Sequence, residues 1–419
     1  MAIIKPFKGL RYSDNAGDLE QLCCPPYDII NDNEREKLID TNDYNIIRLE
    51  KPEQTPEGYK DAAKTLAEWL KEGILRDDEA DCIYAYEFSF FDSGNIRAVK
   101  GFVSLVQLHE FAEGVVLPHE ETLSKAKTDR FSLMTETGCN FSQIYSLYQD
   151  PTNLGLSILN YATMGEPTSE FTDKDTVTHK LWAISDPEVI AKLTKLMADK
   201  KVYIADGHHR YETALAYKAA NTGGTSDCVP MFLVNMENPG LTVWPTHRIV
   251  RDLKGFDYRM ILAKSMQYFE VAEHHSCEKS IAALNEAAKN GKNAFVMYTG
   301  DRFTLMTLKD PNIMNSILAD KAESLRSLDV SVLHSLVLER LFGIDKENMA
   351  AQRNLTYTRD FNEAISAVKS KTANCSFLLN STPIQAISDV ASTGEKMPQK
   401  STYFYPKLTT GLVMNRIFK

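Results

Sequence analysis

The spacing of apolar residues predicts a helix and then a β-hairpin in the first quarter of the chain. Between Glu57 and Leu70 apolar residues recur at helical spacing, and Gly73 is expected to end that helix. Two runs rich in β-branched and aromatic residues, 82–90 and 96–108, follow it. The Asp-Ser-Gly-Asn sequence between the runs favours a turn, so the two runs are expected to pair as a hairpin.

The middle of the chain alternates between strand and helix patterns. The predicted strands cover residues 181–184, 202–205 and 229–234, with further short sheet segments at 241–244 and 249–250. One predicted helix begins after the N-cap residue Asp186, with Pro187 at its first position, and runs to about residue 198. A second covers about 208–220, and Gly223-Gly224 is expected to close it.

The last third is a mixture of helices and strands. Helices are expected at 280–290, 330–342 and 384–391, the middle one amphipathic, with a hairpin at 294–298 and 303–308 and a strand at 376–379. The fold class predicted from this order is α+β (mixed α/β). We expect three parts: an N-terminal α/β region at 1–80, a central domain at 81–250 and a C-terminal α+β region at 251–419.

Composition narrows the class of protein. Of the 419 residues 43% are hydrophobic and 25% are charged, which is typical of globular proteins, and no stretch approaches the length of a membrane span. The formal net charge of −10 argues against a nucleic-acid partner. Seven scattered cysteines without a Cys-x-x-Cys pair indicate reduced thiols. With no long apolar run near residue 1, we expect a cytoplasmic protein; its oligomeric state cannot be read from the sequence.

The strongest chemical signal is the run Asp206-Gly207-His208-His209-Arg210, where a predicted strand passes into a helix. Backbone N–H groups at a helix start attract anions, and glycine lets the backbone approach a ligand closely. Arginine offers a planar donor fork for phosphate, and histidine can move protons near neutral pH. The run therefore predicts a phosphate site. The competing interpretation is a capped surface helix.

A second signal is Pro118-His119-Glu120, which Lys125, Lys127, Asp129 and Arg130 follow. A carboxylate beside cations suits phosphoryl transfer, because the carboxylate takes a hydroxyl proton while the cations stabilise phosphate charge. Arg130 is a candidate phosphate ligand on this ground. By themselves these residues also fit an exposed charged loop.

Two further segments carry candidate residues. Lys400, Ser401 and Thr402 place a cation beside two hydroxyls, which is phosphate-binding chemistry without the glycines of a Walker loop. An ordinary C-terminal strand is the alternative. Near the N-terminus, Tyr27 and Asp28 follow two prolines that restrain the backbone before a helix near Asn31. They are candidates to reach the site, although a purely structural turn fits them slightly better.

These motifs carry two resemblances. Pro118-His119-Glu120 upstream of Asp206-Gly207-His208-His209-Arg210 resembles the free serine kinases of the ParB/sulfiredoxin-like superfamily, over about residues 115–250. The same motifs, with Pro25-Pro26-Tyr27-Asp28 and the segment 397–403, resemble over nearly the full length a bacterial and archaeal family known as domain of unknown function 1015. The gap between Glu120 and Asp206 is longer than in the compact kinases, and the flanking regions have no counterpart there.

The kinase resemblance implies roles for individual residues. Glu120 would be the general base, and a central ParB/sulfiredoxin-like domain would carry the site. The catalytic candidates are Glu120, Asp206, His208 and His209. The nucleotide- or phosphate-binding candidates are Gly207, Arg210, Lys400, Ser401, Thr402 and Arg130. The substrate-binding candidates are His119, Trp244, Thr246, His247, Arg248, Tyr27 and Asp28.

The resulting hypothesis is a phosphotransferase that interconverts free L-serine and O-phosphoserine with an adenine nucleotide, in either direction, as part of serine metabolism. The expected cofactor is Mg²⁺ with ADP or ATP, with no metal site built from protein side chains alone. Three alternatives stay open. Water as acceptor would make a phosphoserine phosphatase. A nucleotide-binding ParB-like module would call for a more basic surface. A metallohydrolase would need a ligand spacing that His119, Glu120, His208 and His209 do not show.

Overall fold

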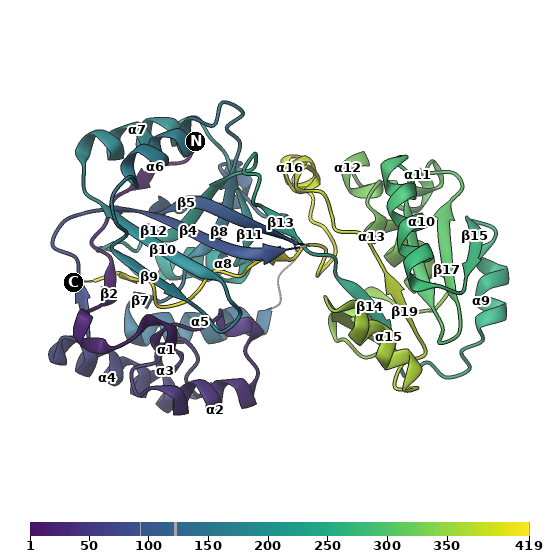
Figure 1. The fold of residues 1–419 in the computed structure, drawn as a ribbon, viewed down its shortest axis with the longest axis horizontal. Coiled ribbons are helices and arrows are strands. Elements are labelled where there is room, and N and C mark those ends of the chain that lie inside the picture. The colour runs from purple at the N-terminus through teal and green to yellow at the C-terminus, as the bar shows by residue number, and fades with distance from the viewer. Residues whose placement is uncertain (93, 121–123, 419) are drawn as a thin grey trace. The chain divides into compact units, whose positions relative to one another are not determined.

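The structure is a computed structural model, and it describes residues 1–92, 94–120 and 124–418, with only the backbone of 124–126. The chain divides into two compact units (Figure 1). The first comprises Met1–Pro118, Thr122–Thr242 and Pro406–Lys419, and the second His119–Glu121 and Val243–Tyr405. The three-part division at residues 80 and 250 stays a prediction.

The centre of the first unit is a nine-stranded mixed sheet. Its strand order is β6-β11-β8-β12-β5-β4-β10-β9, with β1 added along β5. β11 runs parallel to β6 and β12 parallel to β8, whereas the other pairs are antiparallel. The strands are β1 (Ile4–Lys5), β4 (Ile83–Asp92), β5 (Asn95–Gln107), β6 (Val116–Leu117), β8 (Ile144–Tyr148), β9 (Ser169–Thr172), β10 (Thr178–Ile184), β11 (Val202–Asp206) and β12 (Cys228–Asn235).

Helices gather on two sides of this sheet (Figure 1). α6 and α7 lie together on one side, and α1 to α4 lie together on the opposite side, where Trp69 and Leu66 of α4 share a core with Phe141. The helices are α1 (Leu19–Leu22), α2 (Asp32–Thr41), α3 (Ile47–Glu50), α4 (Pro56–Glu72), α5 (Ser124–Thr137), α6 (Leu154–Ala162), α7 (Pro187–Met197) and α8 (His208–Ala220), with 3₁₀ turns η1 (Asp14–Ala16), η2 (Tyr27–Ile29) and η3 (Phe111–Glu113).

Short strands complete the sheets. β2 (Leu10–Tyr12) pairs with β3 (Leu75–Asp77), β7 (Cys139–Asn140) with β21 (Asn415–Arg416), and β13 (Thr242–Val243) with β20 (Phe404–Tyr405). The β7–β21 pair ties the last residues of the chain to the first unit. This return of the chain matters below, because it brings Lys407 to β11.

The second unit is a six-stranded antiparallel sheet with helices on both faces. Its order is β15-β17-β16-β19-β14-β18. Along β16, Phe295 and Met297 enter one core while Val296 and Tyr298 enter the other, so strand alternation buries both faces. The strands are β14 (His247–Val250), β15 (Phe269–His274), β16 (Ala294–Tyr298), β17 (Phe303–Leu308), β18 (Leu355–Thr358) and β19 (Cys375–Leu378). The helices are α9 (Tyr258–Ser265), α10 (Cys277–Lys289), α11 (Ile313–Ile317), α12 (Glu323–Arg326), α13 (Asp329–Val332), η4 (Leu333–Glu339), α14 (Lys346–Ala350), α15 (Phe361–Lys369) and α16 (Ile384–Ser392).

The α+β fold class is confirmed, with 37% helix and 26% strand. The hairpin β4–β5 and the helix α4 with Gly73 in the left-handed conformation at its end match the sequence prediction. So do Asp186 as N-cap of α7 and the hairpin β16–β17. None of the described helices is both long and apolar enough to cross a lipid bilayer.

Two local predictions were wrong, and so was one alternative. The predicted amphipathic helix at 330–342 is α13 followed by a π-helix, η4, and both are buried on nearly every side. α8 ends at Asn221 in extended conformation, ahead of Gly223-Gly224. The alternative of an ordinary strand at Lys400, Ser401 and Thr402 is wrong, since β20 begins only at Phe404.

Candidate functional site

The junction of β11 and α8 presents the Asp-Gly-His-His-Arg run. Apolar residues from Val202 to Ala205 are buried in the sheet, which fixes where the strand ends. The pairing of β11 with β8 is irregular between Ile204 and Asp206, and such an irregularity re-aims the side chain that follows it. Gly207 then takes a φ of 96°, which glycine adopts without strain, and serves as N-cap of α8.

Asp206 is held between two cations. Its Oδ1 accepts from Lys407 Nζ at 2.7 Å, and its Oδ2 accepts from Arg210 Nη2 at 3.0 Å. Burial acts to raise the pKa of Asp206, but Lys407 and Arg210, with His208, outweigh burial and hold the pKa below its ordinary value. The carboxylate is therefore charged at neutral pH and pairs with both Lys407 and Arg210.

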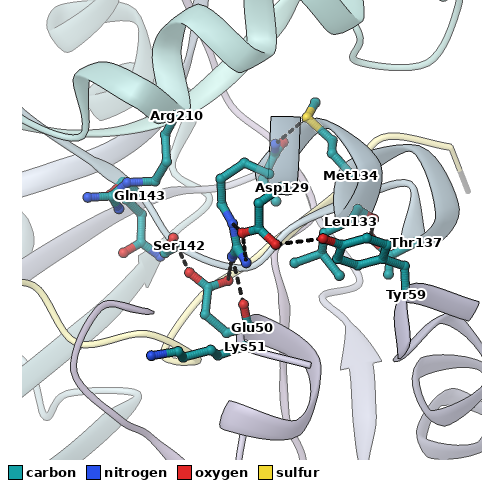
Figure 2. Close-up of polar contacts among 12 residues, drawn as sticks. Glu50, Lys51, Tyr59, Asp129, Leu133, Met134, Thr137, Ser142, Gln143 and Arg210 are labelled. Atoms are coloured by element: carbon teal, nitrogen blue, oxygen red, sulfur yellow. Dashed lines mark hydrogen bonds and ion pairs between the residues drawn. The ribbon is translucent and has the colours of Figure 1, made fainter. Parts of the chain in front are cut away.

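Arg210 is fixed by backbone as well as by Asp206. Its Nη1 donates to the carbonyl oxygen of Gln143, and Figure 2 shows the two side by side. The guanidinium also lies over Gly207, where a Cβ atom would come within 2.9 Å of Arg210 Nε. From the sequence, Gly207 was expected to let a ligand approach the backbone closely. In the structure, the absence of a side chain at Gly207 makes room for the Arg210 guanidinium.

The two histidines begin α8. His208 is buried and near enough to Asp206 to lower the pKa of that carboxyl, while His209 is half-buried. Adjacent residues on a helix point in different directions, so the two rings serve different surroundings. Among the described residues, no group of three or more His, Cys, Asp or Glu is placed to hold a metal ion.

A buried ionic network lies beside Arg210 (Figure 2). Arg130 donates from Nη1 to the Glu50 carbonyl oxygen at 2.6 Å and from Nε to Asp129 Oδ2 at 2.8 Å. Asp129 accepts a hydrogen bond from Tyr59, and the Glu50 carboxylate accepts one from Ser142 at 2.9 Å. Burial raises the pKa of Glu50 although Arg130 and Arg210 oppose the rise.

This network corrects the prediction for Arg130. The side chain is 7% exposed, its donors are directed to Glu50 and Asp129, and the Tyr27 ring centroid lies 4.0 Å from its guanidinium carbon. A guanidinium engaged in this way serves the core, so Arg130 is not retained as a phosphate ligand. Tyr27 joins this first-unit cluster and feels the charge of Arg210, while Asp28 next to it is exposed.

A small cavity of about 50 Å³ links the network to Arg210. Its lining includes Glu50, Arg130, Ser142, Arg210 and Thr213. Thr213 Oγ1 is buried without a hydrogen-bond partner among the described residues. The volume suits a water molecule rather than a metabolite.

In the second unit the Pro-His-Glu segment meets residues 397–402. Lys400 N–H donates to Glu120 Oε1 at 3.1 Å, and Met397 N–H donates to the His119 carbonyl at 2.7 Å. The His119 ring Nε2 lies 2.8 Å from Thr402 Oγ1. Ser401 bonds within its own segment, to Pro398. Two candidate motifs 280 positions apart thus form one cluster.

Arg248 reaches the same segment from β14. It is 1% exposed, and its Nη2 donates to the Lys400 carbonyl at 3.2 Å while Nη1 donates to Thr246 O. Burial lowers the pKa of Arg248 to about 10, against the opposing charges of Tyr357 and Glu120. The Tyr357 ring centroid is 5.5 Å from its guanidinium carbon. Arg248 therefore positions the Lys400 backbone.

The remaining substrate candidates are placed differently. Trp244 stacks on Tyr405 with ring centroids 3.6 Å apart. His247 is buried, and burial with Arg248 lowers its pKa to about 4, so the ring is neutral at neutral pH. Its Nδ1 accepts from Leu379 N–H at 3.3 Å. The His247 side chain is therefore buried and bonded to the backbone of its own sheet region.

Several residues that contribute to the site carry no clear signal in the sequence. Lys407 lies just beyond the motif segment 397–403, and nothing in the sequence pointed to Asp206 as its partner. Gln143 contributes only a backbone carbonyl, which no side-chain pattern reveals. Glu50 ends a short apolar run and gives no signal of its buried ion pair.

The family model described as "Protein of unknown function (DUF1015)" matches residues 4–331, so the chain belongs to that family. No curated protein matches the chain.

Solved structures show low similarity. A conserved hypothetical protein from Pyrococcus furiosus has a TM-score of 0.37 and 14% identity over 70% of this chain and 89% of that one. A free serine kinase in complex with AMP has a TM-score of 0.37 and 13% identity, over 70% of this chain and 84% of the kinase. SbnI from Staphylococcus aureus, truncated at its C-terminus, has a TM-score of 0.35 and 11% identity, over 74% of this chain and 86% of SbnI. The site residues, rather than these similarities, carry the function proposed below.

Proposed function

We propose that this member of the DUF1015 family is a small-molecule phosphotransferase that interconverts free L-serine and O-phosphoserine with an adenine nucleotide. The observation that carries the proposal is the convergence of Lys407 and Arg210 on Asp206 at the start of α8. Two cations beside helix N–H groups attract phosphate, and one aspartate keeps both cations in place.

A protein catalyses phosphoryl transfer mainly by positioning the reactants and by stabilising negative charge. In phosphoryl transfer the reacting oxygens must be aligned while negative charge spreads over the transferred group. Arg210 and Lys407 would stabilise that charge, and their pairing with Asp206 means that they need no reorganisation when phosphate arrives. The half-buried His209, or His208 beside Asp206, would donate a further hydrogen bond to phosphate.

Glu120 is the proposed general base, a role taken from the Pro-His-Glu resemblance. Its Oε1 accepts the Lys400 N–H, which holds the carboxylate in one orientation. A carboxylate in this role accepts the serine hydroxyl proton as the serine oxygen bonds to the terminal phosphorus of the nucleotide. The bond from that phosphorus to its bridging oxygen breaks, and the nucleotide leaves one phosphate shorter. In reverse, the same group returns the proton to serine as the phosphoryl group leaves for the nucleotide.

We expect Mg²⁺ to be bound mainly by the phosphates of the nucleotide rather than by a full set of protein ligands. Mg²⁺ is commonly bound through substrate phosphates with one or two carboxylates, and it would neutralise phosphate charge there. Asp206 supplies a carboxylate at the junction where the phosphates are proposed to bind. The residues of the chain then bind the phosphates, orient the hydroxyl and accept its proton.

Titration with ADP and Mg²⁺ by calorimetry tests the phosphate site. Lys407→Met removes the charge and should weaken ADP binding by about tenfold or more, which is about 1.4 kcal/mol. Lys5→Met is the matched control, because Lys5 pairs with Asp227 at 3.0 Å at an exposed place in the same unit. Undetectable ADP binding by the native protein, or equal loss in both variants, would contradict the assignment.

A further inference from the structure

The second unit contains a cavity that the proposed reaction does not use. Its volume is about 350 Å³, within the range of small-molecule sites. It is bounded by residues of η4, of α14 and of the segment 394–399, with Tyr357 from β18. All of these residues belong to the second unit.

One wall is a polar stripe on an otherwise apolar helix. Ser331 of α13 and His334 and Ser335 of η4 all line the cavity, so these three polar side chains share one wall of it. The residues between and after them are core residues: Val332, Leu333, Leu336, Val337 and Leu338. A helix packed in a core normally carries apolar residues on every face, so the stripe needs a reason.

The polar stripe (Ser331, His334, Ser335) is also short of partners. Ser331 and His334 are 2% and 6% exposed, and neither Ser331 Oγ nor His334 Nε2 has a hydrogen-bond partner among the described residues. Leaving a buried polar group unpaired costs about 1–3 kcal/mol. Burial, with the charge of Arg248, also lowers the pKa of His334 well below its ordinary value, so the ring is neutral.

The local backbone supports a functional reading. The stripe spans the passage from α13 into the π-helix η4. π-Helical turns are rare and are found frequently at functional sites.

The rest of the lining defines the chemistry of the occupant. Lys321, Lys346 and Lys396 supply positive charge, and Glu339 and Glu395 supply negative charge. Lys321 and Glu395 lie 3.2 Å apart as an ion pair. Leucine, methionine, alanine and proline side chains complete the wall: Leu318, Leu325, Met349, Ala350 and Pro398. Charges of both signs around an apolar body suit a zwitterion better than a polyphosphate.

We propose that this cavity is a binding site for a free α-amino acid. Its ammonium and carboxylate groups would meet the glutamates and lysines, its side chain would meet the apolar wall, and its polar atoms would complete the hydrogen bonding of Ser331 and His334. The site is separate from the Asp206 cluster and does not depend on the phosphotransferase proposal.

The cavity adjoins the segment that holds Glu120. Pro398 and Gln399 line it, and they lie between Met397 and Lys400, whose N–H groups bond to His119 and Glu120. An occupant therefore contacts the same stretch of backbone that orients the proposed general base.

A thermal-shift screen of the twenty common L-amino acids, each at about 10 mM, tests the site. A ligand at about 100 times its Kd stabilises the folded state by about 2.7 kcal/mol, so a site of sub-millimolar affinity raises Tm measurably. At least one amino acid should raise Tm, and calorimetry should then give its Kd. If none of the twenty raises Tm, the proposal is wrong.

Three variants then locate the binding. Ala350 is exposed at the end of α14 and lines the cavity, so Ala350→Trp places a large side chain at the cavity wall. His334→Leu replaces the imidazole of another lining residue with an apolar side chain of similar volume. Each of these two variants should bind the amino acid with an affinity lower by about tenfold or more. Ala351→Trp, exposed and outside the lining, is the matched control and should bind like the native protein. Unchanged affinity in Ala350→Trp would overturn the proposal even if His334→Leu failed to fold.

Discussion

Lys407 donates a hydrogen bond to Asp206 across 2.7 Å although 201 positions separate the two residues. The last strand of the chain, β21, pairs with β7, and this return of the chain brings Lys407 to the end of β11. The junction of β11 and α8 is therefore assembled from both the middle and the end of the sequence. The proposed phosphate site forms only when the C-terminal segment is folded against the first unit.

Asp206→Asn should destabilise the protein by about 3 kcal/mol at neutral pH, because it leaves Lys407 and Arg210 without their carboxylate. The pKa of Asp206 is held below its ordinary value, so its contribution is complete above about pH 4 and is lost as pH falls through the folded-state pKa. Urea unfolding at a series of acidic pH values measures this.

Asp227→Asn provides the control for that experiment. Asp227 also pairs with a lysine, but the pair is exposed, and such pairs contribute about 0–1 kcal/mol. Equal destabilisation by the two substitutions, or a pH-independent effect at Asp206, would refute the buried pairing.

Glu50→Gln should give the opposite pH trend. Burial raises the pKa of Glu50 in the folded protein, so folding takes up a proton and the contribution of Glu50 to stability declines as pH rises from about 4. The stability difference between native protein and variant should therefore shrink towards neutral pH. Unfolding curves at several pH values test this, and a difference that grows with pH would show that Arg130 outweighs burial.

Gly207→Ala should lower stability by about 1–3 kcal/mol and also weaken ADP binding. The new Cβ would lie at a φ of 96° and within 2.9 Å of Arg210 Nε, so it would displace the guanidinium. Gly300→Ala is the matched control: its φ is 104°, and no atom lies within 4 Å of the added Cβ. Both should lose stability, but only Gly207→Ala should lose ADP affinity, as calorimetry would show.

Lys400→Gly separates backbone strain from side-chain function. Lys400 has a φ of 59°, so glycine should stabilise the protein by up to about 1 kcal/mol while it removes the ammonium group. Lys371, with a φ of 61°, is the matched control. Both variants should be as stable as the native protein or more so, and only Lys400→Gly should lose turnover. Full turnover in Lys400→Gly would remove Lys400 from the proposed site.

Local pattern was sufficient for the elements around the site. The apolar run before Asp206, the glycine after it and the periodic residues beyond predicted β11 and α8 correctly, because strand and helix periodicity are properties of the nearby sequence. The hairpins succeeded for the same reason.

Long-range pairing was beyond the sequence. Lys407 with Asp206, and Lys400 with Glu120, depend on how distant segments fold together, which no local spacing encodes. Arg130 looked like a phosphate ligand because charge is visible in a sequence and burial is not. The segment 330–342 was predicted as an amphipathic helix because a sequence shows polar positions but not what they face, and here the polar stripe faces a cavity.

The most direct test of the proposed function is a product assay on the purified protein with Mg²⁺, followed by phosphorus NMR. One reaction contains L-serine with ADP or ATP, and the other contains O-phosphoserine with and without AMP or ADP. Nucleotide-dependent interconversion of serine and phosphoserine, abolished in Glu120→Gln, is the result that the proposal predicts. Phosphate release without nucleotide would instead indicate a phosphatase, and no turnover in either reaction would contradict serine as the substrate.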